Sequence, residues 1–277
     1  MRGLSGPRHG IALREGDLGE EDEKKYNYAL RIRDRDEFVE ALTSRMPAAP
    51  DHFARCSEIN RAGPALMRTL RGPSPLRPGE FHARSREEGA VVLDVRSYPA
   101  FSGLHVPGSW HIDLSGNFAT QAGWVLPPDR EIALVVDDWR QAREAALQLR
   151  RVGLDRVGWY LDGGMLDWAA SGLPVDRVPL VSAARAHALV SGRRAVLVDV
   201  RSREEHESAP VPGAVHIPWH DLRTRSTELD PRAPTIVMCR GGQRASIAAS
   251  ILKMKGFASV CNLAGGYAAY RKGGFAP

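Results

Sequence analysis

The chain carries an internal repeat. Residues 93–97 read Leu-Asp-Val-Arg-Ser, and residues 198–202 read Val-Asp-Val-Arg-Ser. A Val-Pro-Gly triplet follows each motif at the same distance, at residues 106–108 and 211–213. Because both parts repeat at one common spacing, we expect the chain to contain two domains of the same fold.

Both copies continue with the same order of elements. An apolar segment (residues 131–136 and 235–238) precedes an Ala/Leu-rich helical segment, and a Gly-Gly pair with a short helix closes each copy. Strands that alternate with helices pair in parallel through right-handed crossovers. We therefore predict an α/β chain with a first copy at residues 76–177 and a second copy at residues 178–277. Each copy is a parallel sheet flanked by helices, and residues 1–75 form an N-terminal extension.

The second copy has a cysteine directly after its apolar segment. Residues 239–244, here called the cysteine loop, read Cys-Arg-Gly-Gly-Gln-Arg and lead into a helical segment at residues 245–255. The first N–H groups of a helix attract anions, and Gly241 and Gly242 allow backbone conformations that direct such groups at one sulfur. Backbone donors and nearby cations also favour the thiolate form of a cysteine. The loop thus indicates that Cys239 is a nucleophile in an anion cradle rather than a structural cysteine.

Several segments of the second copy resemble the rhodanese family of sulfurtransferases, whose active-site cysteine opens a loop of six residues. They are the cysteine loop, the segments at residues 198–206 and 212–218, and the closing segment at residues 262–267. One departure is Ala209-Pro210, where the family usually has Gly-His. It concerns one loop and leaves the expected fold unchanged.

The resemblance implies a sulfurtransferase that needs no metal and no organic cofactor. Cys239 would take the outer sulfur of thiosulfate or of a glutathione-type persulfide and pass it to cyanide or to a thiol acceptor. Arg240 and Arg244 are expected to attract the anionic donor. Gly241, Gly242 and Gln243 complete the substrate-binding loop, whose N–H groups would stabilise the persulfide.

Two alternatives remain open. Phosphatases and arsenate reductases of similar fold have five residues between cysteine and arginine, whereas four separate Cys239 from Arg244. This shorter loop favours sulfur over phosphate chemistry. The second alternative is a sulfur-relay or regulatory module that receives persulfide from a protein partner, such as a separate persulfide dioxygenase.

The first copy has Val-Asp-Asp-Trp-Arg at residues 136–140, where the second copy has the cysteine loop. Without a thiol, and with two carboxylates that repel anions, this copy is expected to be inactive. Asp137 and Asp138 are better explained as caps of a helix N-terminus than as an acid–base pair or metal ligands. The resemblance implies the same, because tandem rhodaneses commonly carry an inactive N-terminal domain that packs against the active one.

The N-terminal extension differs from both copies. Its segments at residues 23–30, 38–39 and 59–64 resemble the tail of the metallo-β-lactamase-like domain in persulfide dioxygenases fused to rhodaneses. The metal-binding His-x-His-x-Asp-His sequence of that domain is absent from this chain. We therefore expect a remnant without a metal site, with a helix at residues 34–45 and a stiff linker at residues 73–78.

Composition sets further limits. The chain has 277 residues, a net charge of +5 and three cysteines, Cys56, Cys239 and Cys261. Three cysteines cannot form a disulfide framework, which is typical of a reducing cytoplasm, and no apolar run is long enough to span a membrane. Basic residues are dispersed and do not interleave with aromatics, so nucleic acid is not an expected partner. Cys261 is predicted to be a small core residue, with a resolving role for Cys261 or Cys56 left open.

Overall fold

The computed structural model describes residues 24–44, 49–66, 69–87 and 89–276, and the chain divides into two compact units, residues 1–49 and 50–277. The described part of the first unit includes the short helices α2 (Tyr28–Arg31) and α3 (Arg35–Thr43). The carboxylate of Asp34 caps α3 by accepting hydrogen bonds from the N–H groups of Asp36 and Glu37. The predicted helix at residues 34–45 is confirmed from Arg35 to Thr43, and residue 45 lies outside the described residues.

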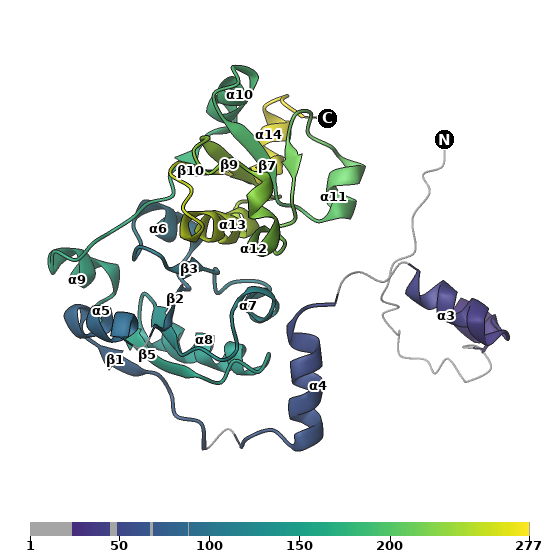
Figure 1. Ribbon diagram of the computed structural model, residues 1–277, viewed down its shortest axis with the longest axis horizontal. Coiled ribbons are helices and arrows are strands. Elements are labelled where there is room, and N and C mark those ends of the chain that lie inside the picture. Colours follow the sequence, from purple (N-terminus) through teal and green to yellow (C-terminus); the bar gives the residue numbers. More distant parts are fainter. Residues whose placement is uncertain (1–23, 45–48, 67–68, 88, 277) are drawn as a thin grey trace. The chain divides into compact units, whose positions relative to one another are not determined.

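The second unit contains two sheets of five strands, both entirely parallel (Figure 1). This confirms the predicted fold class. The first sheet has the order β1 (Ser74–Leu76), β5 (Val157–Leu161), β4 (Ile132–Val135), β2 (Val91–Asp94), β3 (Trp110–His111). The second sheet has the order β6 (Leu180–Val181), β10 (Val260–Leu263), β9 (Thr235–Met238), β7 (Val196–Asp199), β8 (Val215–His216).

Helices connect the strands in the same sequence in both copies. The first copy has α5 (Pro78–Glu87), α6 (Tyr98–Gly103), α7 (Phe118–Val125), α8 (Trp139–Arg150) and α9 (Gly164–Ala170). The second copy has α10 (Ala183–Ser191), α11 (Arg203–Ser208), α12 (Leu222–Arg225), the 3₁₀ helix η2 (Ser226–Glu228), α13 (Gln243–Met254) and α14 (Gly266–Lys272).

The predicted linker at residues 73–78 is wrong. Ser74–Leu76 form β1, which pairs in parallel with β5, and Pro78 begins α5. Pro75 has no N–H to donate, and it is tolerated because β1 lies at the edge of the sheet.

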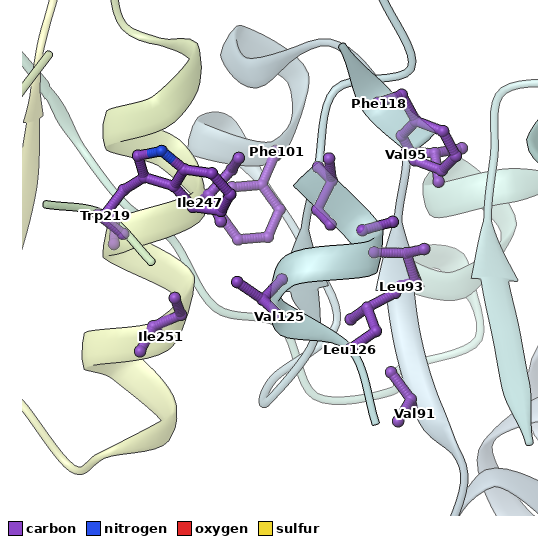
Figure 2. Packing of buried hydrophobic residues seen from close by; sticks show 14 of the residues in the cluster. Val91, Leu93, Val95, Phe101, Phe118, Val125, Leu126, Trp219, Ile247 and Ile251 are labelled. Carbon is purple, nitrogen blue, oxygen red and sulfur yellow. The ribbon is translucent and has the colours of Figure 1, made fainter. Parts of the chain in front are cut away.

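One hydrophobic cluster joins the two copies. Ile247 and Ile251 of α13 belong to the same buried cluster as Phe101 and Val125 of the first copy (Figure 2). All residues of α13 from Ala245 to Leu252 are buried, because this helix packs on its own sheet and also on β3 and α6. Full burial of one large aliphatic side chain contributes roughly 1.5–3 kcal/mol, so the contact fixes α13 against both copies.

Helix α4 (His52–Ala62) precedes the repeat and contacts both copies. The Arg55 guanidinium donates to the carbonyl oxygen of Val152 in the first copy, at 3.2 and 2.7 Å. Before the helix, Asp51 pairs with Arg223 of the second copy at 2.7 Å. The helix therefore ties the end of the N-terminal extension to the repeat.

Candidate active site

Cys239 directly follows β9, and its side chain is buried, with 2% of the residue exposed. The N–H of Gly242 donates to Sγ of Cys239 at 3.0 Å. Gly242 is the residue before α13 and has a φ of +114°, which a residue with a side chain rarely adopts. Gly241 has no positive φ, and a Cβ added there would meet nothing within 4 Å. Of the two glycines, only Gly242 needs its conformational freedom.

The start of α14 supports the base of the cysteine loop. The N–H of Tyr267 donates to the carbonyl oxygen of Cys239 at 2.6 Å. The side-chain amide of Asn262 donates to the carbonyl oxygen of Gly242 at 3.0 Å. A Cβ on Gly266 would overlap the carbonyl oxygen of Cys239, so this position requires glycine. The Gly-Gly pair seen in the sequence therefore lets a second helix approach the loop closely.

The two arginines of the loop have different surroundings. Arg244 forms a bidentate ion pair with Glu205 of α11, at 2.5 and 2.8 Å. Hydrogen bonding from Arg244 lowers the pKa of Glu205 to about 2, so this carboxylate stays ionised. Arg240 is exposed and forms no ion pair with any residue that the structure describes. Its charge is therefore available to an anion at the loop, whereas that of Arg244 is shared.

The first copy touches the cysteine loop. Nε2 of Gln243 donates to Oγ of Ser115 at 2.8 Å, and a Cβ on Gly242 would lie 3.0 Å from Cζ of Tyr98. Asp113 holds both partners, since it accepts hydrogen bonds from the N–H of Tyr98 and from the hydroxyl of Ser115. No sequence signal near Tyr98 or Ser115 indicated this contact, because it depends on how the two copies pack.

A buried ion pair lies at the carboxyl end of the neighbouring strand β7. Asp199, at the end of β7, pairs with Arg201 at 2.6 Å and also contacts Nδ1 of His206 at 2.9 Å. Burial alone would raise the pKa of Asp199, but hydrogen bonds from Arg201 and His206 keep that pKa below its usual value. His216 stacks on His206, with ring centroids 4.2 Å apart. The Arg201 guanidinium covers the ring of Tyr267 at 4.2 Å, which connects this pair to the base of the loop.

The first copy has a capped helix where the second has its cysteine loop. Val136 is buried in the place that corresponds to Cys239. Asp138 is the N-cap of α8 and accepts a hydrogen bond from the N–H of Gln141 at 2.9 Å, which confirms its predicted role as a cap. The side chain of Gln141 in turn accepts from the N–H of Asp137 at 2.8 Å. The N–H groups that could cradle an anion are thus partly occupied by the chain itself.

The other two cysteines lie elsewhere in the fold. Cys261 is a half-buried residue of β10, and burial raises the pKa of its thiol. Cys56 is a half-buried residue of α4. The described residues contain no group of three or more His, Cys, Asp or Glu side chains placed to hold a metal ion. Among the same residues, no helix is both long and apolar enough to cross a membrane.

Comparison with known proteins gives the family. The model of the rhodanese-like domain matches residues 77–171 and 182–272, so the chain belongs to the rhodanese-like family, with two such domains in tandem. The thiosulfate sulfurtransferase GlpE of Pseudomonas syringae is 36% identical over 77 residues, which are 28% of this chain and 73% of GlpE. The putative sulfur carrier protein YrkF of Bacillus subtilis is 39% identical over 70 residues, which are 25% of this chain and 38% of YrkF.

One similar solved structure is a metallo-β-lactamase from Staphylococcus aureus. It is 29% identical, has a TM-score of 0.41, and the match covers 50% of this chain and 38% of that one. The origin of residues 1–75 therefore stays a prediction.

Proposed function

We propose that this protein is a sulfurtransferase that carries sulfane sulfur on Cys239. The observation that supports this most directly is the hydrogen bond from the N–H of Gly242 to Sγ of Cys239, at the start of an α-helix. A donor placed at a sulfur by a fixed backbone stabilises negative charge there without reorganisation. Both the ground-state thiolate and the persulfide formed from it carry that charge.

The reaction has two balanced steps. In the first, the Cys239 thiolate attacks the outer sulfur of thiosulfate, an S–S bond to the enzyme forms, and the S–S bond of the donor breaks. Sulfite leaves with the electron pair. In the second, cyanide or an acceptor thiolate attacks the outer sulfur of the persulfide, and the Cys239 thiolate is the leaving group. No net oxidant or reductant is consumed.

The other residues of the cysteine loop bind the donor or position the loop. Exposed Arg240 meets the anionic donor and neutralises charge on the departing sulfite. Arg244 holds the start of α13 against α11 through Glu205 and adds positive potential near the sulfur. Gly242 and Gln243 set the position of the loop, the first by its backbone conformation and the second by its contact with Ser115.

A glutathione-type persulfide is the second donor class that we propose, with a cellular thiol as acceptor. A relay role, in which a protein partner loads Cys239, has support of its own from the similarity to the putative sulfur carrier protein YrkF. The two roles share the Cys239 persulfide and differ in the donor that forms it.

The test is thiosulfate:cyanide sulfur transfer by the full chain and by its Cys239→Ser variant. The proposal expects turnover by the wild type and none by the variant. Loss of aryl phosphate hydrolysis in the same variant, without sulfur transfer by the wild type, would instead support a phosphatase. Persulfidation of Cys239 in cell extract, with no turnover of small donors, would support the relay.

A further inference from the structure

One face of α13 contacts the first copy. Ile247 and Ile251 share a buried cluster with Phe101 of α6 (Figure 2). On the same face, Oγ of Ser250 accepts a hydrogen bond from the N–H of His111 in β3, at 3.1 Å. Residues three and four positions apart lie on one side of a helix, so these three residues of α13 form a single contact face.

The same face of α8 is open in the first copy. Helices α8 and α13 both have 12 residues, so their positions can be matched from the first residue onward. The matches to the contact face are Arg143 for Ile247, Ala146 for Ser250 and Leu147 for Ile251. All three residues of α8 line a groove of about 560 Å³. Arg143 is exposed and Leu147 is 38% exposed, whereas Ile251 is 1% exposed, so the first copy exposes the helix face that the second copy buries.

The surface that covers α13 also has an exposed counterpart. In the first copy β3 and α6 cover α13, and the repeat makes β8 and α11 their equivalents in the second copy. Phe101 and His111 are completely buried, whereas the matching His206 and His216 are half-buried. Val215 of β8 is 37% exposed. The chain therefore holds one buried interface and exposes both halves of a second one.

A contact at the helix start tests whether these halves fit. The ring of Tyr98 lies against Gly242, since a Cβ on this glycine would be 3.0 Å from Cζ of the tyrosine. Arg203 begins α11 as Tyr98 begins α6, and Asp138 is the N-cap of α8 as Gly242 is of α13. The same packing therefore places Arg203 against Asp138, two opposite charges. Arg203 also pairs with Glu207, but a fully exposed pair of this kind is weak.

A second contact between the copies gives another matched pair. The side-chain amide of Gln243 donates to Oγ of Ser115 at 2.8 Å. Trp139 is the first residue of α8 as Gln243 is of α13, and at the spacing of the repeat Ser115 corresponds to His220. Trp139 is 50% exposed, and the ring of His220 is held in place by stacking on Trp124, with centroids 4.2 Å apart. The same packing thus gives the exposed indole an aromatic partner.

We propose that the exposed face of α8 binds β8 and α11 of a second copy of this chain, as α13 binds β3 and α6 within the chain. Such a contact is heterologous, because each chain contributes a different face, so assembly continues head to tail unless it closes into a ring. Exposed ion pairs contribute little and are screened by salt, so the association is reversible and weakens as salt is added. This assembly is independent of sulfur transfer at Cys239.

Sedimentation velocity of the full chain over a series of concentrations tests the proposal. The average mass should rise with concentration and fall when sodium chloride is added. Arg203→Glu places like charges together at Asp138 and should raise Kd by more than about tenfold, and Leu147→Arg should do the same by blocking the groove. The matched controls are Arg185→Glu on α10 and Leu166→Arg on α9, at an exposed arginine and at a leucine that is 84% exposed. Both controls should associate like the wild type.

A mixture of the two test variants distinguishes head-to-tail assembly from other modes. Arg203→Glu and Leu147→Arg should each be monomeric alone. When they are mixed, the intact α11 of the Leu147→Arg chain meets the intact α8 of the Arg203→Glu chain, so pairs should form and nothing larger. Formation of these pairs also shows that both variants are folded.

Four results would overturn the proposal. They are a wild type that stays monomeric at every concentration, test variants that associate like the wild type, controls that lose association equally, and a mixture of folded variants without pairs. Far-UV circular dichroism identifies a variant that has not folded. Trp139→Ala is the second variant of the α8 face and replaces Leu147→Arg in that case.

Discussion

The two copies share a scaffold and differ at one helix start. Asp94 pairs with Arg96 in the first copy and Asp199 with Arg201 in the second, both at 2.6 Å and both buried. In the first copy the helix after the central strand begins with a carboxylate cap, Asp138, whereas in the second it begins with Gly242, which has no side-chain cap. The buried ion pair therefore belongs to the fold, and the candidate chemistry belongs to the residues between the strand and the helix.

The largest effect is expected from Gly242→Ala. Alanine at a φ of +114° is strained, and its Cβ would press on Tyr98, so the N–H that faces Sγ of Cys239 would shift. A displacement of this kind can lower a rate about 10²-fold. The measurement is the rate of thiosulfate:cyanide transfer. Gly241→Ala is the matched control and should stay within a few-fold of the wild type, and equal rates for both variants would show that the Gly242 conformation is irrelevant.

A smaller effect is expected from Arg244→Gln. It leaves Glu205 without its partner and releases the start of α13 from α11. The transfer rate should fall about tenfold, which corresponds to about 1.4 kcal/mol of transition-state free energy. Arg203→Gln removes a fully solvated pair with Glu207 and serves as the control. If the transfer rate falls equally in both variants, the contact between Arg244 and Glu205 has no specific role in sulfur transfer.

A pH dependence of stability is expected from a buried histidine of the first copy. His111 of the first copy is completely buried, and burial lowers its pKa below the usual 6.5. The unfolded chain then binds a proton more readily than the folded one, so stability is complete above pH 6.5 and falls as the pH drops. One such group contributes a slope of up to about 1.4 kcal/mol per pH unit.

Thermal unfolding between pH 7.5 and pH 5 measures this slope. His111→Gln should flatten it, because the glutamine amide can still donate to the carbonyl oxygen of Arg96 without titrating. An unchanged slope in the His111→Gln variant would contradict this assignment.

The smallest effect is expected from placing a thiol in the first copy. Val136→Cys, made together with Cys239→Ser, puts a cysteine before the capped helix α8. We expect no sulfur uptake from thiosulfate, because Asp137 and Asp138 repel the anionic donor and α8 lacks the glycine cap. A gain of sulfur on this double variant would mean that a thiol at the strand end is sufficient for sulfur uptake and that the cysteine loop is not required.

The sequence allowed prediction of the parts that repeat. Matching motifs indicated two parallel sheets, and the apolar segment before Cys239 became β9 at its predicted bounds. Helix α13 begins at Gln243, two residues earlier than the predicted residue 245, because Gly242 is the N-cap residue. Strand β1 was missed because three residues between prolines are too short to show a strand period.

Contacts between distant segments could not be predicted. Tyr98 and Ser115 reach the cysteine loop only because α13 packs on the first copy. Arg244 pairs with Glu205, which lies in a different segment of the second copy. The sequence did not indicate this pair, so Arg240 and Arg244 were both expected to face the donor. The order of strand, loop and helix around Cys239 could be predicted from the sequence, whereas pairing across elements required the fold.

The most direct test of the difference between the copies is intact-mass spectrometry of the wild type and of Cys239→Ser after incubation with thiosulfate. The account predicts a gain of one sulfur on the wild type and no gain on the variant. A gain on both would contradict it by moving the acceptor to Cys56 or Cys261, and a gain on neither would show that thiosulfate is not a donor for this loop.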